Sequence, residues 1–112
     1  MIYTSILLFA LSAILGLTIL IKWLRKKEAS KAVIYSHGIA AVIALVLLIS
    51  YALQNPENFP KASIMLFAIA AVAGIYMFIQ DMKKKSSPLA LAFTHALVAI
   101  SAFVLLLLFA LN

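Results

Sequence analysis

Four long stretches of the sequence contain no Asp, Glu, Lys or Arg. They cover residues 2–21, 32–53, 62–79 and 89–111. A helix that rises about 1.5 Å per residue needs roughly 20 apolar residues to cross the ~30 Å hydrocarbon core of a bilayer, and each stretch approaches or exceeds this length. Apolar residues make up 67% of the chain, against about 45–50% in soluble domains. The sequence therefore predicts an all-α membrane protein with a single transmembrane domain over residues 1–112.

The two halves of the chain resemble each other. When residues 1–54 are aligned with residues 59–112, 19 of the 54 pairs are identical, and the only two histidines, His37 and His95, fall on each other. Each half contains two of the apolar stretches and would form one helical hairpin. Because a hairpin crosses the membrane an even number of times, both copies would have the same orientation. We therefore expect a four-transmembrane-helix bundle made of two tandem parallel helical-hairpin repeats, related by an axis along the membrane normal.

Identical positions of the two repeats fall on one face of each expected helix. The second and fourth helices share four of them at i, i+4, i+7 and i+11: His37/His95, Ala41/Ala99, Ala44/Ala102 and Leu48/Leu106. The first and third helices share four at i, i+3, i+7 and i+10: Ile6/Ile64, Phe9/Phe67, Ala13/Ala71 and Gly16/Gly74. Both spacings keep the residues on a single helical stripe. Because lipid accepts almost any apolar residue, the faces that stayed the same are expected to point into the bundle.

Positive charge gathers in two of the three connections. The first contains Lys22, Arg25, Lys26, Lys27 and Lys31, and the third contains Lys83, Lys84 and Lys85. By the positive-inside rule these connections are cytoplasmic, and both termini and the 54–61 loop lie outside. We expect a multi-pass protein of the cell (inner or plasma) membrane, with the lipid bilayer as its main partner. The net charge of +6 is thereby explained by topology and not by nucleic-acid binding.

Several kinds of chemistry are excluded by the residues that the chain lacks. It has no cysteine, which excludes disulfides, thiolate ligands, iron–sulfur clusters and covalent haem attachment. No Ser-His-Asp set, HExxH motif or pair of intramembrane acids is recognisable, so there is no hydrolase or transferase signature. The first apolar stretch has no basic residue before it and no small-residue cleavage site after it. It is therefore expected to be a membrane span and not a removable signal peptide.

The histidines and their neighbouring glycines are expected at one depth in the membrane. Gly16 lies six residues before Lys22, and His37 lies six residues after Lys31. This spacing places each about 9 Å above the inner boundary of the bilayer. Gly74 and His95 stand at similar distances from the polar ends of the third and fourth helices. The four residues would form one layer in which histidine and glycine alternate around the bundle.

Two imidazoles that face each other across an apolar interior can ligate the iron of a b-type haem. We expect one non-covalent haem b per chain, with His37 and His95 as its metal ligands. The glycines would leave room for the flat macrocycle, and alanines would add space above it. The residues predicted to hold the haem are His37, His95, Gly16, Gly74, Ala41 and Ala99.

Further residues are predicted to support such a site. A hydrogen-bond acceptor is needed for the second nitrogen of each imidazole, and Ser36, Thr94 or a backbone carbonyl one turn back would supply it. Propionate groups directed toward the near interface would find counter-charges among the lysines of the connections. These lysines are Lys27, Lys31, Lys84 and Lys85.

Histidines on the second and fourth helices, with glycines on the first and third at the same depth, resemble the haem-binding four-helix bundle of membrane cytochromes b, and more loosely the cytochrome b561 type. The resemblance covers the whole chain and is architectural. It implies non-covalent haem b and one-electron transfer between a quinol, the haem and a partner protein. Those families carry two histidines on each ligand helix and hold two haems, whereas this chain has one per helix. Because of this departure, only a single haem near the cytoplasmic face carries over from the resemblance, and a complete electron path across the membrane does not.

Two other kinds of function are compatible with the sequence. One is a small transporter, or a bundle that conducts protons or metal ions through the histidine pair. Small multidrug exporters of this length rely on a membrane-embedded glutamate, whereas Glu28, Glu57 and Asp81 lie in or beside the connections. The other alternative is a non-catalytic accessory subunit of a larger membrane complex. The sequence leaves open whether the chain forms a homodimer, whether it binds quinone, and whether it is an electron-transfer component.

Overall fold

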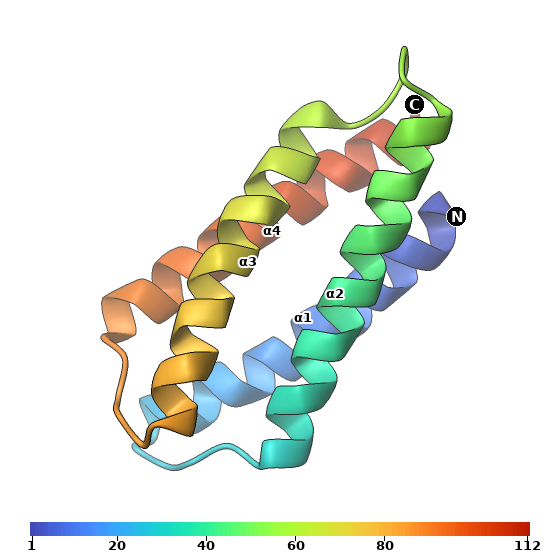
Figure 1. Cartoon of the computed structure of the whole chain (residues 1–112). Coiled ribbons are helices and arrows are strands. Elements are labelled where there is room, and N and C mark those ends of the chain that lie inside the picture. Colours follow the sequence, from blue (N-terminus) through green and yellow to red (C-terminus); the bar gives the residue numbers. More distant parts are fainter.

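The chain folds into four long helices joined by three short connections (Figure 1). A computed structural model describes all 112 residues. The helices are α1 (Ile2–Leu24), α2 (Lys31–Gln54), α3 (Lys61–Met82) and α4 (Leu89–Leu111). All four are long and apolar enough to cross a membrane. The prediction of an all-α protein with four membrane-spanning helices is confirmed.

The helices differ from the predicted stretches mainly at their polar ends. Helix α1 continues three residues beyond Ile21, through Lys22 to Leu24, and α3 continues past Ile79 to Met82. The predicted bounds were set by the first charged or polar residue, but a helix continues beyond the hydrocarbon core wherever its backbone hydrogen bonds can still form. The extra turns carry the ends of α1 and α3 toward the basic connections.

Helices α2 and α4 begin without a side-chain cap. Ser30 is the N-cap residue of α2, but its side chain makes no capping hydrogen bond. Pro88 takes the N-cap position of α4, not the first helical position, and no serine caps that helix. Its ψ of 138° is extended, so the helix begins only at Leu89.

Helices α1 and α3 end in the same way. Lys26 and Lys84, which are equivalent in the sequence alignment of the two halves, have positive φ values of 56° and 58°. The backbone N–H of the next residue then bonds back five positions, from Lys27 to Lys22 O at 2.8 Å and from Lys85 to Gln80 O at 2.9 Å. This is the Schellman arrangement that terminates many helices. Each basic connection therefore leaves its helix with the same turn.

The helices form a closed ring: each packs against the next helix along the chain, and α4 packs against α1. Packing is closest within the two hairpins, α1 with α2 and α3 with α4. Figure 1 shows both termini and the turn between α2 and α3 at one end of the bundle, and the two basic connections at the other. The bundle is 44 Å long, which is enough to cross a bilayer.

The tightest core lies in the half of the bundle that is nearer the termini. Six buried residues form it: Phe9, Ala44, Leu48, Phe67, Ala102 and Leu106. The rings of Phe9 and Phe67 stack across the bundle with centroids 3.8 Å apart and planes 3° from parallel. Both rings belong to this buried core.

Candidate functional site

His37 is held in place by α1. Its Nδ1 lies 2.7 Å from the backbone carbonyl oxygen of Ser12 and 3.0 Å from the Ser12 hydroxyl. That hydroxyl donates a hydrogen bond to the backbone carbonyl of His37 at 3.0 Å. Because a carbonyl oxygen can only accept, Nδ1 must carry the proton. In the neutral ring the lone pair is then on Nε2, the nitrogen that is free to bind a metal.

His95 has the equivalent bond in the second hairpin. Its Nδ1 donates to the backbone carbonyl oxygen of Ala70 at 2.8 Å. Ala70 aligns with Ser12, so the two histidines use carbonyls at the same position of their hairpins, but His95 has no hydroxyl beside it. The Nδ1–H of His95 is fixed in the same way, and its Nε2 is likewise the available nitrogen.

The two imidazoles lie close together in the interior. Their ring centroids are 6.3 Å apart and their planes are inclined by 79°. The rings come from α2 and α4, which lie diagonally across the four-helix ring. The predicted convergence of the two histidines is therefore present in the structure.

The glycines make room for the histidine rings themselves. A Cβ atom added to Gly16 would lie 2.8 Å from Cε1 of His37, and one added to Gly74 would lie 3.1 Å from Cε1 of His95. Real Cβ atoms essentially never approach another heavy atom as closely as the first of these distances. Space for the imidazole therefore accounts for the glycine at position 16 and favours one at position 74, and the predicted space for a macrocycle edge stays a prediction.

A cavity of about 670 Å³ lies beside the histidine pair. Its volume is within the roughly 300–1,000 Å³ that is usual for small-molecule and cofactor sites. Most residues that line it are hydrophobic. All six residues predicted to hold a haem are among them: His37, His95, Gly16, Gly74, Ala41 and Ala99.

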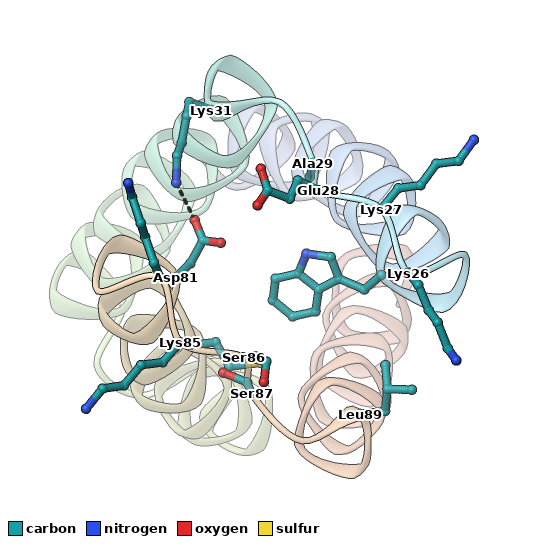
Figure 2. Close-up of a pocket in the computed structure, with 13 residues that line it drawn as sticks. Lys26, Lys27, Glu28, Ala29, Lys31, Asp81, Lys85, Ser86, Ser87 and Leu89 are labelled. Carbon is teal, nitrogen blue, oxygen red and sulfur yellow. Dashed lines mark hydrogen bonds and ion pairs between the residues drawn. The ribbon is translucent and has the colours of Figure 1, made fainter.

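A second cavity, of about 570 Å³, lies at the basic end of the bundle and is lined by both basic connections. It adjoins the first, since Trp23, Met77 and Asp81 line both. We call it the mouth. Lys31 of α2 forms an ion pair across it with Asp81 of α3, at 2.8 Å (Figure 2). The mouth is thus bridged on the α2–α3 side.

The lysines predicted as counter-charges differ in where they point. All four line the mouth: Lys27, Lys31, Lys84 and Lys85. Figure 2 shows the side chains of Lys27 and Lys85 extending away from the opening, while Lys31 is engaged by Asp81. The positive charges of these lysines are therefore not concentrated at the centre of the mouth.

The predicted hydrogen-bond acceptors were wrong. Ser36 is exposed, and the hydroxyl of Thr94 donates to the carbonyl of Ala90 in its own helix at 2.7 Å. The acceptor for each imidazole is a carbonyl, but on the neighbouring helix of the hairpin instead of one turn back in the same helix. Ser12 was not predicted, because the site was inferred from positions that are identical in the two repeats. In that alignment Ser12 is paired with Ala70.

No protein-family model matches the sequence, and no match is found among the curated proteins or the solved structures. Any functional conclusion therefore depends on the residues and their geometry.

Proposed function

We propose that the protein is an integral membrane b-type haem protein that holds one haem between His37 and His95. The observation that carries this proposal is that the same hydrogen bond orients both imidazoles and sets their tautomer. Each Nδ1 donates to a carbonyl of the preceding helix, which leaves both Nε2 atoms without the proton. Metal-ligating histidines almost always donate their other ring N–H in this way.

The separation of the rings supports the proposal. Metal–imidazole bonds of about 2.0 Å, with each ring centre about 1.1 Å behind the bonding nitrogen, place two axial imidazoles on one metal about 6.2 Å apart. The observed centroid separation is 6.3 Å. The 79° inclination is compatible with axial ligation, because each ring can rotate about its own bond to the metal.

The chemical composition of the site also favours a porphyrin. The structure contains no group of three or more His, Asp or Glu side chains that could hold a metal ion. A structural zinc site takes four protein ligands, whereas a porphyrin supplies four equatorial nitrogens and needs only axial ligands from the protein. The apolar cavity beside the histidines offers space for a flat hydrophobic group.

A bound haem would supply a one-electron redox centre, and the protein would serve electron transfer or redox and haem sensing. The residues of the chain would contribute the axial nitrogens, their fixed tautomers and an apolar surround that excludes water. A quinone or a redox partner protein would exchange electrons at the mouth, which adjoins the cavity. The packing of the other half favours this role over transport, since the stacked phenylalanines belong to a buried apolar core there.

The proposal is tested on the full chain purified from membranes after expression with added haem. The wild type should be red, with the low-spin spectrum of a six-coordinate haem that sharpens on reduction by dithionite. His37→Ala and His95→Ala should each abolish this low-spin spectrum while the protein stays in the membrane. Thr94→Ala is a matched control, because Thr94 is next to His95 but bonds only its own helix, and it should leave the spectrum unchanged. A colourless wild type, or low-spin spectra in both histidine variants, would refute the haem assignment.

A further inference from the structure

The two histidines are equivalent in the sequence repeat but are not held equally. Nδ1 of His37 has two acceptors, the carbonyl and the hydroxyl of Ser12. Nδ1 of His95 has one, the carbonyl of Ala70. The Ser12 hydroxyl also donates to the carbonyl of His37, so it links α1 to both the ring and the backbone of that histidine. No side chain links α3 to His95 in this way.

The steric surroundings show the same difference. The backbone of Gly16 lies nearer to its histidine ring than that of Gly74, with ideal Cβ positions 2.8 Å and 3.1 Å from the respective Cε1 atoms. Helices α1 and α2 also pack more closely than α3 and α4. Hydrogen bonding, ring contact and helix packing therefore all hold His37 more firmly than His95.

We propose, on the basis of the haem site above, that His37 is the permanent ligand and His95 the exchangeable one, so that a small neutral diatomic molecule binds the reduced haem on the His95 side. If haem is bound, Nε2 of His95 would leave the iron and the diatomic molecule would take its place, so that one dative bond would be exchanged for another. No electron would be transferred, and the displaced imidazole would keep its Nδ1 proton. The adjoining cavity gives the displaced ring and the ligand space.

The first test compares the two histidine variants under identical conditions. His95→Ala should keep close to one five-coordinate haem per chain after gel filtration, and added imidazole should restore its low-spin spectrum. His37→Ala should retain at least tenfold less haem, because the remaining ligand is the weakly held one. Equal retention by the two variants, or the reverse order, would overturn the assignment while leaving the haem proposal intact. A wild type that binds no haem would instead refute the haem proposal itself.

The second test keeps both histidines and adds a hydroxyl beside His95. Ala70→Ser gives His95 the acceptor that His37 already has, and it should slow carbon monoxide binding to the dithionite-reduced protein about two- to tenfold, the range for one net hydrogen bond. Ala68→Ser, on the exposed side of α3, is the matched control and should leave the rate unchanged. Ser12→Ala should increase haem loss from the His95→Ala background. An unchanged rate in Ala70→Ser together with unchanged haem loss in the double variant would contradict the inference.

Discussion

Each histidine ring packs against a glycine of the neighbouring helix. Gly16 and Gly74 face the imidazoles of their own hairpins, and neither has a positive φ, so space and not backbone conformation requires glycine there. Small residues commonly allow close approach of transmembrane helices. Here the group that approaches is a ring that must keep a defined direction if its Nε2 is to serve as a ligand.

Substitution of these glycines should lower haem content in a graded manner. Gly16→Ala forces His37 away from a 2.8 Å contact, and overpacking of this kind costs about 1–3 kcal/mol, or roughly 5- to 150-fold in haem affinity. Gly74→Ala should have a smaller effect, because its contact is 3.1 Å. Leucine at either position should remove most of the haem. The haem-to-protein ratio of the purified variants measures this order.

Gly38 provides the control for these substitutions. It lies beside His37 in the sequence and in the same cavity lining, but a Cβ atom added to it meets nothing within 4 Å. Gly38→Ala should therefore leave haem content unchanged and stabilise α2 by about 0.5–1 kcal/mol, since glycine weakens a helix interior. Loss of haem in Gly38→Ala equal to that in Gly16→Ala would show that the glycine-to-ring contact is not the cause.

At the scale of the helices, an equivalent hydrogen bond joins the two helices within each hairpin. The hydroxyl of Ser5 donates to the carbonyl of Ala44 at 2.8 Å, and that of Ser63 donates to the carbonyl of Ala102 at 2.8 Å. Both serines are essentially inaccessible, with 0% and 1% exposed. The bonds of the serines, the histidines and the basic turns thus occur at positions that are equivalent in the alignment of the two halves.

Removal of either serine hydroxyl should destabilise the bundle by a similar amount. We expect Ser5→Ala and Ser63→Ala each to cost about 1 kcal/mol, the usual net value of a hydrogen bond, with values near 0.6 kcal/mol typical between membrane helices. Unfolding of the purified protein in detergent measures the loss. Ser101→Ala, on an exposed face of α4, should have no measurable effect. A large effect at only one of the two buried serines would contradict their equivalence.

Much of the helix arrangement could be predicted, because charge-free length and repeat identity are properties of the sequence alone. The inward direction of His37 and His95 followed from the same identities. Contacts that depend on the relative rotation and height of two helices could not be predicted in this way. The carbonyl partners of the histidines, the Phe9–Phe67 stack and the Lys31–Asp81 ion pair are all of this kind. Ser12 could have been found by asking where the repeats differ as well as where they agree.

At the scale of the whole molecule, both basic connections lie at one end and the termini with the α2–α3 turn lie at the other. This arrangement is the one that the positive-inside rule requires for a single orientation in the membrane. The mouth would then open toward the cytoplasm. The Lys31–Asp81 ion pair joins the two hairpins on one side of the mouth. In the alignment of the two halves, Leu89 and Trp23 occupy the equivalent positions, so the opposite side has no such ion pair.

Single cysteines can determine this orientation, because the chain contains none of its own. Ser30→Cys and Ser86→Cys, both exposed and in the basic connections, should react with a membrane-impermeant maleimide only after the membrane is permeabilised. Asn58→Cys, exposed in the turn at the other end, should react in intact cells. Labelling in the opposite order would reverse the orientation, and labelling of all three in intact cells would indicate a mixed population.

The stacked phenylalanines have a consequence for bioenergetics. They belong to the buried core on the side of the termini, so we expect a redox centre beside the histidines to be reached from the face with the basic connections. Reducing equivalents would arrive and depart through that one face, and no charge would be carried across the membrane voltage. A protein of this kind would neither build nor dissipate a proton-motive force, and its activity should be indifferent to uncouplers.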